Sequence, residues 1–275
     1  MIDERRRAPA RVRSLEVGDV RVTSVPDGRI QLHPAGWYGR SEPPRPAAEV
    51  RPLLDVDGYL VASVGSLVIE SGDQVIALDT GLGPVDVPRG RGRPAIGRMT
   101  GGTLPVEWQA AGLPEPTQVV ITHLHEDHSG WWSSDAPFGT GLRSLPTTAG
   151  RLDLERSALA ERSDRWQPAD GGEQLAPGVT VVPMPGHTPG HIGLRIESRG
   201  RVLIAFGDAL HSPLQVGDPT INAFVEHDPV MAITTRAALL DELERDDALA
   251  YGNHFADVVF GRVEHRRWVP VGESG

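Results

Sequence analysis

Four side chains that can bind a metal ion lie within six residues, directly after an apolar segment. The segment Gln118–Thr122 is rich in β-branched residues and predicts a strand. The residues that follow it supply three histidines and one aspartate: His123, His125, Asp127 and His128. Because side chains alternate along an extended chain, the first two can point toward one ion, while the last two, in the following turn, can point toward a second. A fold for this chain must therefore bring further ligands to the end of this strand.

Further candidate ligands occur later in the chain, each after a short apolar run. They are His187, Asp208 and His254. Any one of them alone is typical of an ordinary turn. Together with the first motif, they place five histidines and two aspartates at predicted strand ends, enough for two metal sites that share a bridging carboxylate. Imidazole nitrogens and carboxylate oxygens suit zinc, and also Mn, Fe or Co.

Two residue types that are absent narrow the chemistry further. The chain has no cysteine and no lysine, and all 27 of its basic residues are arginine. Thiol nucleophiles, iron–sulfur clusters, Schiff-base chemistry and the P-loop phosphate grip are therefore excluded. The net charge of −10 argues against nucleic acid as a partner, because a phosphate-binding surface needs clustered positive charge. We expect a small-molecule substrate.

The rest of the sequence predicts a mixed α/β domain of layered sheets and helices. Asp228 and Pro229 have the pattern of a helix start, and the helix should run to about Asp246. Weaker helix candidates are Leu104–Ala111 and Leu152–Arg162. The predicted strands, besides the one before His123, are Val20–Val25, Ser66–Glu70, Gln74–Leu78, Val179–Met184, Ile192–Glu197, Arg201–Phe206, Val258–Val263 and Arg267–Val271.

We expect a flexible, charged N-terminal lead over residues 1–14 and a single domain over residues 15–275. Residues 85–102 are rich in Gly, Pro and Arg and predict a long loop, either a lid over the substrate or a solvated connector. The arginines near the start are not followed by an apolar run, and no segment reaches membrane-spanning length. These features predict a cytoplasmic protein without a membrane partner; a homodimer is compatible with the sequence.

The chain resembles the hydrolases of the metallo-β-lactamase fold. The motifs that carry the resemblance occur in the family's order, from about residue 60 to 260: Leu78-Asp79-Thr80-Gly81, the segment 123–128, Gly186-His187-Thr188-Pro189-Gly190-His191, Gly207-Asp208 and His254. The resemblance implies an α/β (α+β) fold, a four-layer αββα sandwich with a dinuclear metal site at one edge of its two sheets.

The resemblance also implies a role for each matching residue. The first metal would be held by His123, His125 and His187, the second by Asp127, His128 and His254, with Asp208 bridging them. Asp79 is implied as a supporting carboxylate near the ligand histidines, and His191 is interpreted as fixing the loop after His187. Two zinc ions would make hydroxide available from a bridging water, and Asp127 would orient it and carry its proton to the leaving alkoxide.

The resemblance favours an ester-like bond in a small, partly apolar molecule, with a lactone of the acyl-homoserine type ranked first. An organophosphate or aryl ester is the alternative on the same site, and a mononuclear iron persulfide dioxygenase is the alternative from another class. Many lactonases of this family have tyrosine where this chain has His211, which resembles the organophosphate-hydrolysing side. His211 is therefore either a substrate contact or a supporting loop histidine. Trp131 and Trp132 are candidates for an apolar pocket or for the core, and we expect one of them, Trp131, to touch substrate.

Overall fold

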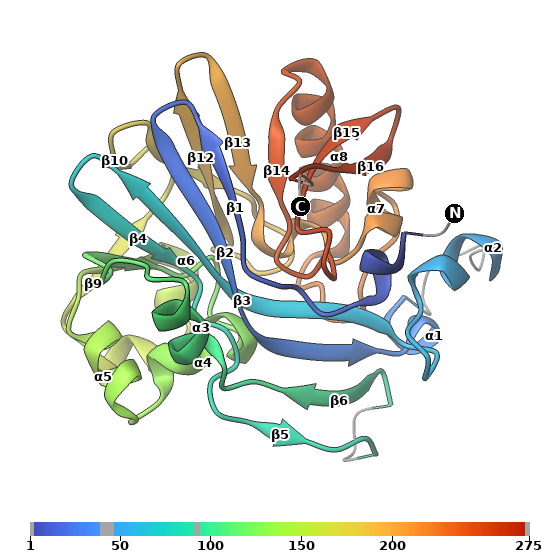
Figure 1. Cartoon of the computed structure of the whole chain (residues 1–275), viewed down its shortest axis with the longest axis horizontal. Helices are drawn as coiled ribbons and strands as arrows, with labels where there is room; N and C mark the ends of the chain where they lie inside the picture. The colour runs from blue at the N-terminus through green and yellow to red at the C-terminus, as the bar shows by residue number, and fades with distance from the viewer. Residues whose placement is uncertain (1–2, 39–46, 91–93, 273–275) are drawn as a thin grey trace.

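The computed structural model describes residues 3–38, 47–90 and 94–272, which form two β-sheets and the helices around them (Figure 1). The first sheet has nine strands in the order β5-β6-β2-β3-β4-β7-β8-β9, with β1 paired to β2. The bounds of these strands are Arg13–Val17 (β1), Val20–Leu32 (β2), Leu60–Ser71 (β3), Gln74–Leu78 (β4), Asp86–Val87 (β5), Ile96–Thr100 (β6), Gln118–Val120 (β7), Thr147–Gly150 (β8) and Trp166–Ala169 (β9).

The second sheet has seven strands in sequence order, β10 to β16. Their bounds are Gln174–Ala176 (β10), Val179–Pro183 (β11), Ile192–Ser198 (β12), Arg201–Ala205 (β13), Leu249–Tyr251 (β14), Phe260–Glu264 (β15) and Arg267–Pro270 (β16). The strands expected from the sequence are present, and turns at Gly72 and Gly200 join antiparallel pairs, β3 with β4 and β12 with β13. The pairs β4–β7 and β13–β14 are parallel, so their carboxyl ends face the same way within each sheet.

The main core lies between the two sheets. Leu67, Ile69 and Ile76 of the first sheet pack there against Leu194 and Ile196 of the second. Nearly every residue of β3 is buried, as expected for a strand covered on both faces. The interior of the protein is thus formed by two sheets packed face to face.

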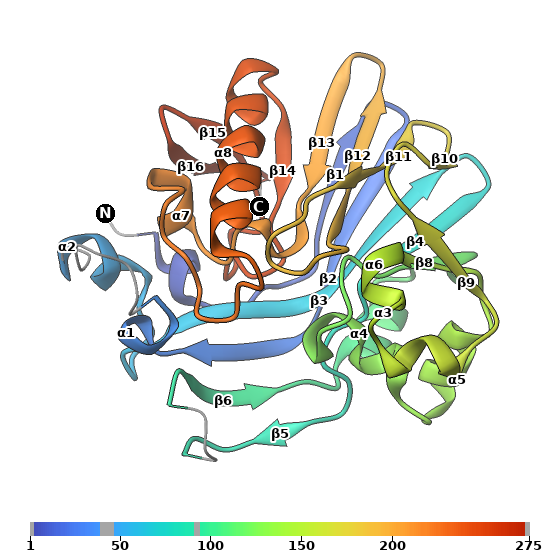
Figure 2. The same ribbon diagram turned by 180° about the vertical axis from the view of Figure 1, so that it is seen from behind.

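Helices cover the two outer faces. On the first sheet, the core beneath the helices contains Trp108 from α3, Trp132 from α4 and Leu142 from α5. On the second sheet, α8 buries Leu240 and Leu243, and Figure 2 shows this helix beside β14 and β15. The order helix, sheet, sheet, helix confirms the predicted four-layer αββα sandwich.

The helices are short apart from α8. Their bounds are Pro34–Trp37 (α1), Ala47–Val50 (α2), Leu104–Ala110 (α3), Glu126–Ser133 (α4), Pro137–Arg143 (α5), Arg151–Leu154 (α6), Pro213–Gly217 (α7) and Pro229–Arg245 (α8). The predicted start of α8 is confirmed, because the Asp228 carboxylate accepts the backbone N–H groups of Val230 and Met231. Within the described ranges, no helix has the length and apolar character needed to cross a membrane.

Two helix and loop predictions are corrected. The helix expected over 152–162 is interrupted: Ser157 has an extended backbone, and its hydroxyl caps a separate 3-10 helix, Ala158–Arg162. The long loop expected over 85–102 instead contains β5 and β6, which pair with each other and extend the first sheet beyond β2. Pairing of β6 with the end of the long strand β2 outweighs the weak local pattern of residues 85–102. Within that segment, residues 91–93 lie outside the described residues.

The described part of the N-terminal lead, residues 3–14, lies along the domain and makes hydrogen bonds to it. The Arg5 guanidinium donates to the backbone carbonyl of Asp257, and the Asp257 carboxylate accepts from the Arg11 backbone N–H and from the Arg13 guanidinium. Ala10 N–H donates to Ser63 Oγ. A buried carboxylate needs such partners, so Asp257 anchors this segment along the domain.

Candidate metal centre

The fold brings all seven predicted ligands to one edge of the two sheets. Each ligand follows the carboxyl end of a strand or lies in the loop joining two strands. His123 follows β7 and Asp208 follows β13, which are central strands of the two sheets. Because β4 runs parallel to β7 and β14 runs parallel to β13, the turn at Asp79 and the loop at His254 reach the same edge. The sequence therefore folds so that separate strand ends supply one site.

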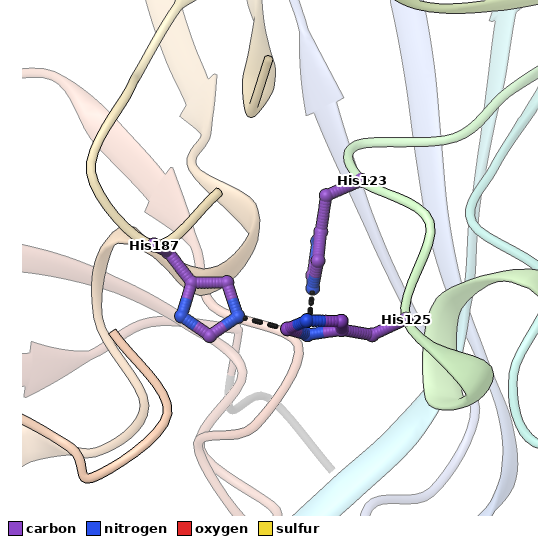
Figure 3. Close-up of side chains that lie close together, drawn as sticks. All are labelled: His123, His125 and His187. Carbon is purple, nitrogen blue, oxygen red and sulfur yellow. Dashed lines mark hydrogen bonds between the residues drawn. The ribbon is translucent and has the colours of Figure 1, made fainter. Parts of the chain in front are cut away.

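Three histidines, which we call the first triad, direct one nitrogen each to a common point: His123, His125 and His187 (Figure 3). His125 Nδ1 lies 2.9 Å from His123 Nε2 and 3.1 Å from His187 Nε2. The other nitrogen of His187 lies 3.0 Å from the Glu226 carboxylate, which can only accept, so that nitrogen carries the proton. The Nε2 atom of His187 therefore presents a lone pair to the common point.

The second triad consists of Asp127, His128 and His254. His254 Nδ1 donates to the Ser63 carbonyl at 2.8 Å, and His128 Nδ1 donates to Asp79 Oδ2 at 2.8 Å. Both rings consequently turn their Nε2 atoms toward carboxylate oxygens. His254 Nε2 lies 3.4 Å from Asp127 Oδ2.

Asp208 lies between the triads. Its Oδ1 is 3.1 Å from both His128 Nε2 and His254 Nε2, while its Oδ2 is 3.4 Å from His187 Nε2. His191 holds the backbone of Asp208 in place: its Nδ1 donates to the Met184 carbonyl, and its Nε2 accepts the Asp208 backbone N–H at 3.0 Å. One oxygen of Asp208 thus faces each triad.

In these contacts, imidazole nitrogens with a free lone pair face carboxylate oxygens, so a hydrogen-bond acceptor faces another acceptor. This arrangement is typical of a site that binds a cation. His128 Nε2 and Asp208 Oδ1 are both buried without a hydrogen-bond partner, although they face each other. Buried acceptors that face one another are costly unless a cation lies between them. Two divalent ions fit this donor set, one in each triad with Asp208 shared, and nitrogen and oxygen ligands of this kind suit zinc.

The electrostatic environment differs between the triads. Burial, followed by the neighbouring imidazoles, lowers the pKa of His123 well below its usual value, and burial together with His187 lowers the pKa of His125 to about 4. These rings stay neutral, the form in which a nitrogen binds metal. Burial also acts to lower the pKa of His128, but Asp208 and Asp79 outweigh it and raise that pKa well above its usual value. A proton or a metal ion is thus strongly attracted to the second triad.

The structure brings Asp79 and His211 to the site. Asp79 contacts His128 as described, and its Oδ1 accepts the Thr122 backbone N–H at 2.8 Å. His211 is buried, with Nε2 3.2 Å from Asp208 Oδ2 and its ring packed edge-on against Trp37. Among the described residues, His211 does not line the cavity that opens onto this site.

Trp131 lies beneath the site and does not line the cavity. Its side chain is buried, and its indole N–H donates to Asp27 Oδ1 at 2.7 Å. Asp27 also accepts backbone N–H groups from Leu82 and Leu104, which ties α4 and α3 to the turn after β4. Trp132 is buried too and donates to Thr147 Oγ1. Both tryptophans therefore pack in the core, which is the alternative to the substrate contact expected for Trp131.

Sequence reasoning missed Glu226. This buried carboxylate contacts His187 across 39 positions of sequence, from the loop before α8. No motif surrounds it, so no local signal could have found it.

A cavity of about 330 Å³ opens onto the metal centre. Its polar end is formed by six side chains: His125, Glu126, Asp127, His187, Asp208 and His254. The remaining wall is largely apolar and comes mostly from the end of the first sheet, with Ile30, Leu32, Trp37, Ala62, Leu82, Ile96, Met99, Leu124 and Val225. No arginine lines the cavity among the described residues. The site therefore combines a metal-binding end with an uncharged, apolar arm.

Solved structures share this fold. A dizinc quorum-quenching lactonase, AidC, in complex with its product, superposes with a TM-score of 0.75 at 19% identity, covering 96% of this chain and 98% of that one. The hydrolase AbOPH superposes with a TM-score of 0.77 at 18% identity, covering 97% and 99%. At these identities the likeness concerns the fold alone.

Sequence comparisons agree. A "probable metallo-hydrolase" of Mycobacterium tuberculosis is 27% identical over 173 residues, 53% of this chain and 56% of its own length. An N-acyl homoserine lactonase of Bacillus thuringiensis is 25% identical over 147 residues, 50% of this chain and 54% of its own length. The chain thus spans about half the length of the curated relatives it matches. The family model of the metallo-beta-lactamase superfamily matches residues 61–254, well over half of the chain, and the chain belongs to this superfamily.

Proposed function

We propose that this protein is a metal-dependent hydrolase that opens an ester-like bond in a small, partly apolar molecule, with a lactone as its preferred substrate. The observation that carries the proposal is the convergence of buried lone pairs from two triads at the end of an apolar cavity. When bound, two zinc ions would make hydroxide available at neutral pH and polarise the carbonyl. The N-acyl homoserine lactonase among the curated relatives supports the same substrate class.

The residues that line the cavity favour a neutral, partly apolar substrate. Its apolar wall would bury an acyl chain and gain about 0.8 kcal/mol for each CH₂ removed from water. The absence of an arginine among its described lining residues removes the usual partner for an anionic group. A neutral ester with an apolar arm therefore matches the site better than a phosphate monoester.

Asp127 is the residue of this site best placed to move a proton. It lines the cavity, and its Oδ2 faces His254 Nε2 at 3.4 Å. A carboxylate held at the border between the triad and the cavity can orient a water molecule and carry its proton to the leaving alkoxide. His211 contacts Asp208 and is absent from the described lining of the cavity, so we assign it to supporting that carboxylate.

The proposal is tested with the purified protein supplied with zinc and a panel of acyl lactones, aryl esters and a phosphotriester. We expect kcat/KM for lactones to exceed that for the other classes by orders of magnitude. In the same assay Asp127→Asn should lower kcat by about 10²- to 10⁴-fold, the usual contribution of acid–base catalysis. Absence of hydrolysis across the panel, or full activity of D127N, would contradict the proposal.

A phosphotriester is the second candidate, and His211 is the observation that favours it. A neutral phosphotriester fits the same cavity, which has no arginine among its described lining residues, and His211 stands where many lactonases of the family have tyrosine. Preference for the phosphotriester in the panel would move the assignment to this class without changing the metal centre.

A further inference from the structure

A fully buried ion pair lies directly behind one histidine of the first triad. Glu226 Oε2 is 3.0 Å from His187 Nδ1, and Glu226 Oε1 is 2.9 Å from Arg236 Nη2. The side chains of Glu226 and Arg236 are both 0% exposed. An isolated buried charge is expensive, so each member of the pair depends on the other.

Arg236 is itself held in place by backbone groups from two segments. Its Nε donates to the carbonyl of Ala209, the residue after the bridging Asp208, at 2.8 Å. Its Nη1 donates to the carbonyls of Pro219 and Ile221, both at 2.7 Å. The guanidinium therefore has a fixed position in α8 and cannot swing away from Glu226 without losing several hydrogen bonds.

Backbone hydrogen bonds also join the loop of His187 to the residues just after Glu226. His227 N–H donates to the His187 carbonyl at 3.1 Å, and Asp228 N–H donates to the Gly186 carbonyl at 2.9 Å. Gly186 lies so close to α8 that a Cβ atom there would come within 2.4 Å of the Ala232 nitrogen. The loop that carries His187 is thus pressed against the start of α8.

We propose that Glu226 and Arg236 are positioning residues for His187, acting on the first triad from α8 and the loop before it. The Glu226 carboxylate keeps the proton on Nδ1 of His187 and leaves the Nε2 lone pair facing the cation site. Arg236 keeps the carboxylate charged and oriented within the interior. This inference rests on the metal centre proposed above. It adds that Glu226 and Arg236 set the cation affinity of the first triad.

Glu226→Gln is the direct test, because glutamine has the same shape without the charge. Its amide oxygen can accept a hydrogen bond from Arg236 or from His187 Nδ1–H but not from both, because the NH₂ group then faces the other residue. When the NH₂ group faces His187, the imidazole proton is driven to Nε2, toward the cation site. The matched control is Glu242→Gln, in the helix of Arg236, whose carboxylate pairs with Arg195 at 2.7 Å and touches no proposed ligand.

Three measurements separate positioning from mere stability. Zinc affinity is measured by chelator competition, the His187 tautomer by ¹⁵N NMR of the imidazole nitrogens, and folding by thermal unfolding in chelator. We expect E226Q to weaken binding of one zinc by about 10- to 100-fold and to shift His187 away from the Nδ1–H tautomer. E242Q should match the wild type in zinc affinity and tautomer.

The outcomes distinguish this inference from the proposed function. A wild-type protein that fails to bind two zinc ions refutes the metal centre itself. A wild type that binds two, with an E226Q variant of unchanged zinc affinity and His187 tautomer, overturns the positioning role alone, as does an equal loss in E242Q. If E226Q does not fold, Arg236→Lys keeps the charge but lacks the guanidinium fork, and it should weaken one zinc site by a smaller factor; unchanged zinc affinity in R236K would overturn the inference.

Discussion

The two triads contain the same number of ligands but differ in their charge and in what supports them. The first triad is all nitrogen, and it shares the negative charge of Asp208, whereas the second has a carboxylate of its own, Asp127. Each triad includes one histidine backed by a carboxylate, Asp79 for His128 and Glu226 for His187. Asp79 comes from a strand end beside the motif, while Glu226 comes from the loop before α8. A carboxylate thus supports one histidine of each triad, from the strand end next to β7 in one case and from the loop before α8 in the other.

Removing one nitrogen from either triad should have the largest effect. His187→Ala empties part of the first triad and His254→Ala part of the second, and each leaves the other triad intact. We expect each variant to hold one zinc in place of two and to lose at least about 10³-fold in kcat/KM, because the site loses charge stabilisation where the oxyanion develops. Metal analysis and lactone kinetics check this.

The control for this pair is His265→Asn, which removes an exposed imidazole in a turn at φ 50°, a conformation that asparagine tolerates. It should retain both zinc ions and full activity. Loss of both zinc ions in H187A but of neither in H254A would show that the triads are not two comparable sites.

A smaller effect is expected when the support of the second triad is changed. In Asp79→Asn the amide NH₂ group can face His128 Nδ1, which moves the imidazole proton to Nε2 and toward Asp208. The backbone at Asp79, with φ 59°, accepts asparagine. Zinc affinity of one site should fall by about 10- to 100-fold, measured by chelator competition.

Thr122→Ser is the matched control, since its hydroxyl still reaches Asp79 and His123. It should bind zinc as the wild type does. If D79N affects the same zinc ion as E226Q, the division into two separately supported triads is incorrect.

Acid should distinguish the triads in chelator-treated, metal-free protein. With its pKa lowered to about 4 from the usual 6.5, chiefly by burial, His125 stays neutral as the pH falls from 7 to 5. His128, whose pKa is raised by Asp208 and Asp79 against the effect of burial, is protonated over that range. A cation must displace this proton, so the second triad should lose affinity as the pH falls, whereas no such proton has to leave His125. NMR titration of ¹⁵N-labelled imidazoles checks this; His125 and His128 titrating together near 6.5 would contradict it.

The proposed ligands could be recognised in the sequence because they occur in short motifs after apolar strands. His123, Asp208 and His254 each follow such a run. The strands before Asp208 and His254 pair in parallel, and the packing of the two sheets brings the end of β7 to the same edge. The start of α8 was equally predictable, because the Asp228 cap acts within three residues. Local chemistry determines these features.

Features set by distant contacts were not predictable in this way. The strands β5 and β6 form because the end of β2 offers unpaired backbone groups. Trp131 joins the core because Asp27, far away in sequence, accepts its N–H. Glu226 acts on His187 only after α8 has packed against the second sheet. In each case the deciding partner lies outside the local pattern.

The number of zinc ions bound per chain tests the central claim most directly. Native mass spectrometry of the zinc-supplied protein, with metal content confirmed by elemental analysis, should find two ions in the wild type. Asp208→Ala, which removes the carboxylate shared by both triads, should lower the affinity for both. Two ions per chain in the wild type would support the two-triad site. A single iron with oxygen consumption would instead indicate a mononuclear oxidoreductase, and it would contradict the account.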